Sequence, residues 1–119
     1  MRYLYFKRVV FPVVLICGLA AATTRAEPAT HTVVIEAMKF SPNSLKVHVG
    51  DTIVFKNADL VPHTATEKSS KRFDSGTLNR NAEWKLVPKN SGTIHYKCLL
   101  HPDMEGSIMV EAAPSPSPQ

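Results

Sequence analysis

Strand-like segments follow one another along most of this chain. From residue 32 onward, short runs rich in Val, Ile, Phe and Thr alternate with Pro, Gly, Asn and Asp. Runs of this kind, bounded by turn-forming residues, are typical of β-strands joined by tight turns. They predict an all-β fold, a β-sandwich of seven to eight strands. The clearest runs are Thr32–Ala37, Leu45–Val49, Thr52–Lys56, His63–Thr66, Glu83–Val87, Thr93–Cys98 and Ser107–Glu111.

Alternation within these runs assigns side chains to the two faces of a sheet. In the second run Val47 falls on the apolar face and His48 on the polar face. In the run that ends at the second cysteine of the chain, Tyr96 and Cys98 share the apolar face, whereas His95 falls on the opposite one. We therefore expect Cys98 to leave its strand on the core side of the sandwich.

An export signal is predicted at the N-terminus. Three basic residues precede an apolar run from residue 9 to 22, and small residues before Ala26 suit cleavage after that position. The run is shorter than the roughly 20 apolar residues of a membrane-spanning helix, so we predict no membrane span in the mature form. The resulting division is a signal peptide over 1–26, one domain over 27–111 and a flexible Pro/Ser tail over 112–119, in a periplasmic or secreted protein.

Charge and cysteine content limit the kinds of partner. Four of the 14 Lys and Arg residues lie in the predicted signal peptide, which leaves ten against ten Asp and Glu. A net charge near zero gives no basic surface for nucleic acid. Cys17 follows Ile16 in the apolar leader, a poor lipidation context that leaves lipid anchoring open. Cys98 is then the single thiol of an exported domain, which predicts either an inert buried thiol or a thiolate held by a metal.

Soft metal donors gather in one short segment. Cys98, His101 and Met104 stand at intervals of three after a predicted strand. Thiolate, imidazole and thioether together favour copper, and a trigonal His2Cys plane with a weak axial Met is the arrangement of blue, electron-transfer copper sites. Zinc is the main chemical rival, but its protein ligands are thiolate, imidazole and carboxylate rather than thioether. Met38 and Met109 are rival thioethers that we assign to packing within strands.

The second imidazole must come from another part of the chain. His48 and His95 fall on polar faces, and His31 lies near the new N-terminus, where order is weak. His63 follows an apolar segment, Leu60-Val61-Pro62, that can pack against the cysteine loop. We therefore predict one type 1 copper ion with four ligands, namely His63, Cys98, His101 and Met104.

The order and spacing of these motifs resemble the small cupredoxins of the plastocyanin and azurin family, most of all the amicyanin-like members with a short ligand loop. The resemblance implies a Greek-key β-sandwich with copper at one end, and electron transfer outside the cytoplasm. Many members have Asn after the first His and Ser or Thr after the Cys, where this chain has Thr64 and Leu99; Thr64 can still bond to backbone. The matching segments are Phe40-Ser41-Pro42, Leu45 to Asp51, Pro62-His63-Thr64, Phe73 to Gly76, Gly92 to Cys98 and the loop from Cys98 to Gly106.

An electron carrier is the predicted function. Four protein ligands leave the metal no open coordination position, which disfavours an enzyme. We expect backbone N–H groups near Leu100 or His101 to donate to the Cys98 sulfur and tune the potential. A monomer would dock transiently on a redox protein through an apolar patch around His101. The patch residues are Leu60, Val61, Pro62, Leu99, Leu100 and Pro102.

Two other functions are weighed against electron transfer. A periplasmic copper carrier or storage protein is the main alternative, because it would use the same ligands but release Cu(I) to a competitor. An accessory module of a multicopper oxidase or nitrite reductase is disfavoured, because the additional His clusters that such a module needs are missing.

Overall fold

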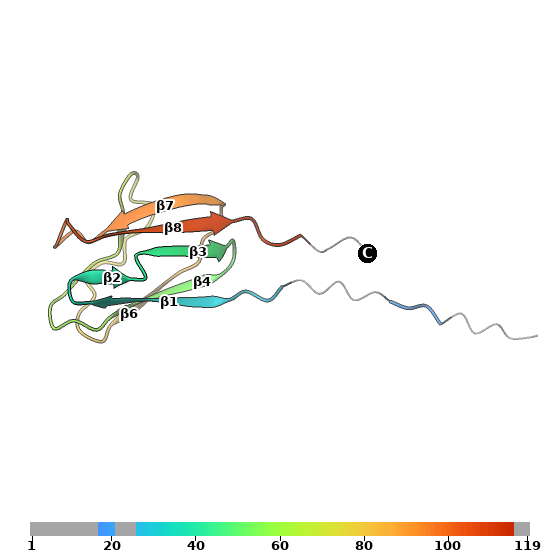
Figure 1. The fold of residues 1–119 in the computed structure, drawn as a ribbon, viewed down its shortest axis with the longest axis horizontal. Coiled ribbons are helices and arrows are strands. Elements are labelled where there is room, and N and C mark those ends of the chain that lie inside the picture. Colours follow the sequence, from blue (N-terminus) through green and yellow to red (C-terminus); the bar gives the residue numbers. More distant parts are fainter. Residues whose placement is uncertain (1–16, 21–25, 116–119) are drawn as a thin grey trace, which may run out of the picture.

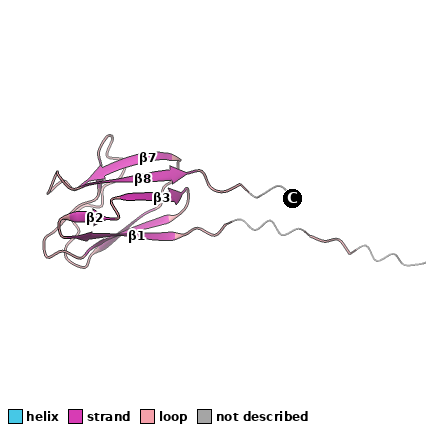
Figure 2. Ribbon diagram, viewed as in Figure 1, coloured by secondary structure: helices cyan, strands magenta, loops and turns pink. Residues whose placement is uncertain are grey.

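Two β-sheets pack face to face in the described part of the chain, residues 17–20 and 26–115 of this computed structural model (Figures 1 and 2). The strands are β1 (Thr30–Glu36), β2 (Lys39–Ser41), β3 (Ser44–His48), β4 (Thr52–Asn57), β5 (Thr66–Glu67), β6 (Glu83–Leu86), β7 (Gly92–Lys97) and β8 (Glu105–Glu111). One sheet has the order β2-β1-β4-β6 and the other the order β3-β8-β7-β5. The predicted all-β sandwich is confirmed.

Every connection from β2 to β7 crosses from one sheet to the other. β1 pairs in parallel with β4, and β3 pairs in parallel with β8, so strands that are distant in sequence become neighbours. β7 and β8 form an antiparallel pair in which Gly92 lies opposite Val110 and Lys97 lies opposite Glu105. This arrangement agrees with the Greek-key connectivity that the family resemblance implies.

The predicted alternation of faces is confirmed. Val47, Tyr96 and Cys98 are buried, His95 is exposed and His48 is partly exposed. Alternation predicts these faces because successive side chains of a strand point to opposite sides of the sheet.

Two strand predictions need correction. β2 was not expected, because its run is only three residues long and ends at Pro42, which cannot donate to a ladder. The predicted strand from His63 to Thr66 is wrong in extent: His63 makes a single bridge to Leu78, and the paired strand is the short β5.

The rival methionines are also not packed as expected. Met38 lies in the turn between β1 and β2, and Met109 lies on the outer face of β8. Their side chains are 43% and 50% exposed, so the assignment of both residues to packing is wrong. Met104, in contrast, is buried.

The predicted signal peptide lies mostly outside the described residues. Its described parts, residues 17–20 and Ala26, have no regular structure, and neither do residues 112–115 of the predicted tail. Within the part of the chain that is described, no helix has the length and apolar character needed to cross a bilayer. β1 begins and β8 ends at the same end of the sandwich, so the loop between β7 and β8 lies at the other end (Figure 1).

Three aromatic rings form the centre of the core. The Tyr96 ring makes edge-to-face contacts with Phe40 and Phe55, with centroid distances of 4.8 and 5.3 Å. The same ring lies directly over Gly106, its cross-strand neighbour on β8, where an added Cβ would lie 2.3 Å from the Tyr96 ring. Gly106 is therefore required by the close approach of this ring. The Tyr96 hydroxyl is buried without a hydrogen-bond partner, and burial raises its pKa.

Replacing Tyr96 with Phe is expected to stabilise the protein. The substitution keeps the ring contacts and removes a buried hydroxyl without a partner, whose desolvation costs about 1–3 kcal/mol. The free energy of unfolding, measured by urea denaturation of the metal-free protein, should therefore rise. An unchanged or lower value would show that the hydroxyl gains a partner in solution.

Candidate metal centre

The loop between β7 and β8 brings three of the predicted ligands together. Cys98 follows the last residue of β7 and is fully buried on the core side, as alternation predicts. The Cys98 backbone N–H donates to the Met104 carbonyl (3.0 Å), and the Met104 N–H donates to the His101 carbonyl (2.9 Å). These two bonds close the loop into a tight turn, with Met104 packed in the same buried cluster as Cys98.

A second segment, which follows β4, supplies His63. Its backbone pairs with Leu78 through two hydrogen bonds of 3.1 and 2.7 Å, and its side chain is completely buried. The single bridge that replaced the predicted strand therefore fixes this residue beside the loop between β7 and β8.

Thr64 joins the two segments. Its backbone N–H donates to the Cys98 sulfur (3.3 Å), and its hydroxyl accepts from the Leu99 backbone N–H (2.8 Å). The prediction that Thr64 bonds to backbone is confirmed. The expectation that residues near Leu100 or His101 donate to the sulfur is wrong, because the donor comes from the segment after His63.

Three donor atoms converge at this junction. The Cys98 Sγ lies 3.9 Å from His63 Nδ1 and 3.7 Å from His101 Nδ1, and the two ring nitrogens lie 3.2 Å apart. Among the described residues, this is the one group of His, Cys, Asp or Glu side chains whose donor atoms all lie within 4.8 Å of one another. His31 is not part of this group; its ring contacts the Asp51 carboxylate instead.

Asp59 holds the His63 ring from the side opposite the sulfur. One carboxylate oxygen, Oδ2, lies 2.8 Å from His63 Nε2. Burial alone would raise the pKa of Asp59, but the Met38 N–H, the His63 ring and the Ala37 N–H together hold it below its usual value. An ionised carboxylate can only accept, so Nε2 carries the proton. The lone pair of Nδ1 then faces the Cys98 sulfur, ready for a metal.

Asp59 is itself held in place by the turn between β1 and β2. Ala37 and Met38 have φ angles of 50° and 59°, a left-handed turn whose two N–H groups donate to the Asp59 carboxylate at 2.8 and 3.1 Å. The Asn57 side chain accepts from the Asp59 N–H and donates to the Leu78 carbonyl. Asp59 was not identified from the sequence. The one indication in the sequence is that this carboxylate lies four residues before the predicted ligand His63.

The donor set fits copper. The buried Cys98 sulfur accepts a backbone N–H, and both imidazoles place a ring nitrogen within 3.9 Å of it. The buried thioether of Met104, on the same closed loop, adds a soft donor that suits copper and not zinc. The residues present therefore fit a single copper ion.

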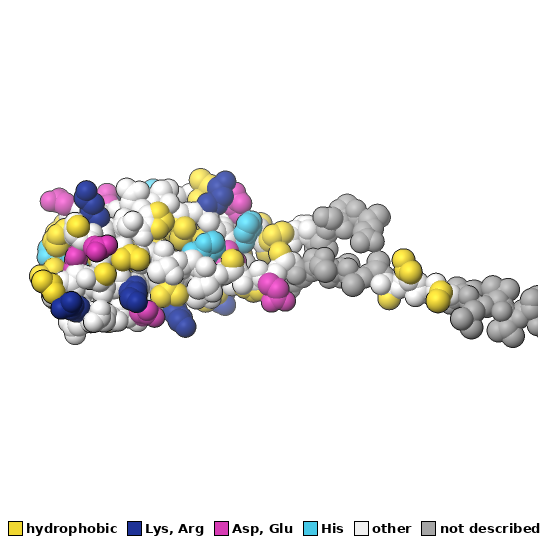
Figure 3. Space-filling view, turned by 60° about the horizontal axis from the view of Figure 1, so that its bottom comes forward, with side chains coloured by type: hydrophobic (Ala, Val, Ile, Leu, Met, Phe, Trp, Pro, Cys, Tyr) yellow, Lys and Arg dark blue, Asp and Glu magenta, His cyan; other side chains and the backbone are white. Residues whose placement is uncertain are grey.

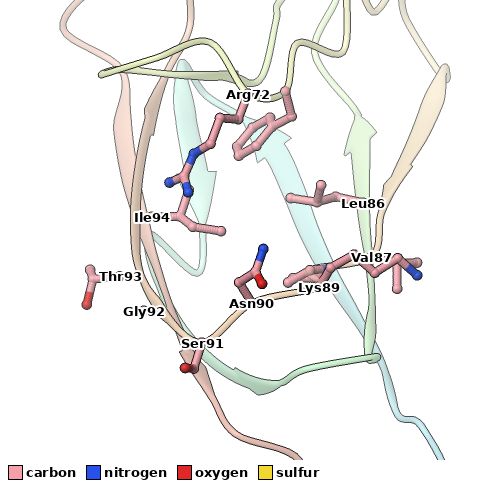
Figure 4. Close-up of a pocket in the computed structure, with 11 residues that line it drawn as sticks. Arg72, Leu86, Val87, Lys89, Asn90, Ser91, Gly92, Thr93 and Ile94 are labelled. Carbon is pink, nitrogen blue, oxygen red and sulfur yellow. The ribbon is translucent and has the colours of Figure 1, made fainter.

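A cavity away from the loop has a different character. It has a volume of about 250 Å³ and lies between β6 and the start of β7 (Figure 4). Arg72, Leu86, Asn90 and Ile94 point into it. It holds no cluster of metal donors, because the three converging residues lie beyond the other end of β7.

A β-sandwich with His, Cys and Met donors gathered on one end loop defines a small copper protein. The sequence profile of the cupredoxin-like domain matches residues 9–110, and the chain belongs to this family. Among its relatives are the amicyanins. Amicyanin-alpha of Methylorubrum extorquens is 28% identical over 101 residues, which are 82% of this chain and 85% of that protein. Amicyanin of Paracoccus denitrificans is 29% identical over 92 residues, 72% of this chain and 70% of that protein.

Solved structures show the same fold. An amicyanin variant in its Cu(I) form superposes with a TM-score of 0.65 at 27% identity, over 69% of this chain and 82% of that one. A purple cupredoxin from Nitrosopumilus maritimus superposes with a TM-score of 0.64 at 26% identity, over 68% of this chain and 99% of that one. The second structure supports the cupredoxin fold, and the first, together with the amicyanin sequences, supports the predicted resemblance to amicyanin-like members.

Proposed function

We propose that this protein is an exported blue copper protein that carries single electrons between redox partners. His63, Cys98, His101 and Met104 would hold the copper ion. The observation that carries this proposal is the convergence of one buried sulfur and two ring nitrogens within 3.9 Å of one another. The Cu(II)/Cu(I) couple supplies the one-electron chemistry.

The protein's contribution is to keep the donors fixed. His63 is fully buried; its Nε2 contacts Asp59, and its Nδ1 faces the Cys98 sulfur. Thr64 joins the two ligand segments by hydrogen bonds. A site that moves little between oxidation states exchanges electrons with little reorganisation. No ligand position is left for a substrate, so we propose a carrier without enzymatic activity.

An apolar patch surrounds the partly exposed His101 and is the proposed docking surface. Leu60 is 77% and Leu100 is 49% exposed. Transient redox encounters bury less than about 1,200 Å², which suits a patch of this size. Asp103 is exposed beside it, whereas Glu105 is paired with Lys68 at 2.6 Å. The proposed patch consists of Leu60, Val61, Pro62, Leu99, Leu100 and Pro102, all of which are exposed.

The location proposed for this function is the periplasm or the exterior of the cell. The support is the predicted signal peptide over residues 1–26, together with a free buried thiol that a bound metal would protect from oxidation. We propose a monomer, because transient docking leaves the patch free between encounters.

Copper titration tests the proposal. One equivalent of Cu(II) is expected to give an intense visible thiolate-to-copper band and a small EPR hyperfine splitting, and the protein should cycle between Cu(II) and Cu(I) without losing metal to a Cu(I) chelator. A colourless complex would contradict a blue copper site. Rapid loss of Cu(I) to the chelator would instead support a copper carrier or storage protein.

Replacing Leu100 with Asp is expected to slow electron self-exchange without changing the visible spectrum. A charge in the middle of an apolar contact costs more than about 1 kcal/mol, so the rate constant should fall about tenfold. Met109→Asp is the matched control, because Met109 is 50% exposed on the outer face of β8, away from the patch. Equal effects of the two variants on the NMR-measured rate would argue against docking through the patch.

A further inference from the structure

Two histidines and two carboxylates lie together at the opposite end of the sandwich. His31 is in β1, His48 ends β3, Asp51 is in the turn between β3 and β4, and Glu111 ends β8. Figure 3 shows histidine and acidic side chains together near the end of the body from which the tails leave. The copper site and the docking patch use none of these residues.

One oxygen of Asp51 is the common point of this group. Asp51 Oδ2 lies 3.0 Å from His31 Nε2 and 3.9 Å from His48 Nδ1. The backbone N–H of His48 is the main group that lowers the pKa of Asp51 to about 2, against the effect of burial. The buried carboxylate is therefore charged, and it is fixed by N–H donors from His48 and Ala29 at 2.9 Å.

Glu111 orients the second imidazole. His48 Nε2 lies 3.4 Å from Glu111 Oε2, while the other oxygen of Glu111 lies 3.2 Å from the Lys46 ammonium. A carboxylate beside one ring nitrogen favours the proton on that nitrogen and leaves the lone pair on the other. The free nitrogen of His48 is then Nδ1, the atom that faces Asp51.

A cavity opens beside these donors. Its volume is about 490 Å³, and His31, His48 and Asp51 line it together with residues 26–29, Lys46, Val49, Gly50, Ala113 and Pro114. The Lys46 ammonium is paired with Glu111. The space can hold an ion with water ligands. The three donor atoms are more widely spread than those of the copper site, so the half-exposed His48 side chain must move toward Asp51 for all three to bind one ion.

We propose that His31 Nε2, His48 Nδ1 and Asp51 Oδ2 bind one divalent ion of the zinc type, with Glu111 as the positioning carboxylate of His48. Imidazole and carboxylate donors suit Zn²⁺, and three protein ligands leave a position for water. On binding, the ring proton of His31 passes from Nε2 to Nδ1 through exchange with solvent, and the ion takes its place between His31 and Asp51. The second lone pair of Oδ2 still accepts the His48 backbone N–H. Binding joins the start of β1 to the turn between β3 and β4.

Calorimetric titration of Zn²⁺ into the purified, copper-loaded protein tests this site. Copper fills the first site and is not displaced by zinc, because Cu²⁺ binds more tightly than Zn²⁺ to the same donors. One equivalent of Zn²⁺ is expected to bind and to raise Tm. His31→Ala, His48→Ala and Glu111→Gln should each weaken the binding about tenfold or more. His95→Ala is the matched control, an exposed histidine on β7 that should leave zinc binding unchanged.

Three results would overturn the second site: no zinc bound beyond the copper, binding that is unchanged in His31→Ala and Glu111→Gln, or binding that His95→Ala removes. Failure of the proposed copper function gives a different result. If the first site does not hold copper, wild type binds up to two equivalents of Zn²⁺, of which His31→Ala loses one.

Discussion

Replacing Cys98 with Ser removes the intense visible band of the copper-loaded protein. Sγ of Cys98 lies 3.9 and 3.7 Å from the two ring nitrogens and accepts a hydrogen bond from the Thr64 N–H. A serine hydroxyl does not ionise at neutral pH and has no charge-transfer transition to Cu(II) in the visible range. We expect any remaining Cu(II) to be weakly held and nearly colourless, with a large EPR hyperfine splitting.

The measurement is absorption and EPR after addition of one equivalent of Cu(II). His95→Ala is the control, because this exposed histidine on β7 lies outside the donor group and should keep the full blue spectrum. A blue band that survives in Cys98→Ser would contradict the assignment of the thiolate ligand. Circular dichroism of both metal-free variants checks that the β-sandwich is intact.

Asp59→Asn is expected to weaken copper binding by about 10- to 100-fold, the usual cost of losing a partner of a ligating histidine. The carboxylate accepts from His63 Nε2 at 2.8 Å and from the Ala37 and Met38 N–H groups. An amide keeps the size but has one oxygen in place of two. If that oxygen takes the Oδ2 position, it still accepts from Met38 and His63, but the NH₂ group faces the Ala37 N–H; if it takes the Oδ1 position, the NH₂ group faces the Met38 N–H and His63 Nε2. Either orientation sets two donors against each other, and both lose the negative charge beside His63, so the His63 ring is held less well for the metal.

Competition with a Cu(II) chelator measures this affinity. Asp103→Asn is the matched control, because Asp103 is an exposed carboxylate on the ligand loop itself, and its loss should change the affinity little. Asp59→Glu should recover part of the affinity, because it restores an acceptor. If the Asp59→Asn and Asp103→Asn variants bind copper with equal affinity, the hydrogen bond from His63 to Asp59 does not contribute to copper binding.

The strands were predicted well wherever one face is buried. Val47, Tyr96 and Cys98 occupy the core side that alternation gave them, because a shift by one residue would expose every apolar side chain of the strand. β2 and the segment around His63 were predicted poorly. β2 has only three residues, too few to show an alternating pattern. The backbone of His63 pairs with Leu78, which lies beyond β5, and a local pattern does not reveal such a partner.

The sequence by itself determined the all-β fold class and the chemistry of the site. A thiol, an imidazole and a thioether stand at fixed spacing on one loop, and they indicate copper because metal preference depends on the type of donor atom, which the sequence shows directly. Only the tertiary structure decided how the loop is held. Thr64 is 34 residues from Cys98, and Asp59 meets Ala37 from 22 residues away. Hydrogen bonds of this kind depend on which segments the two sheets bring side by side, and that is settled when the whole core packs.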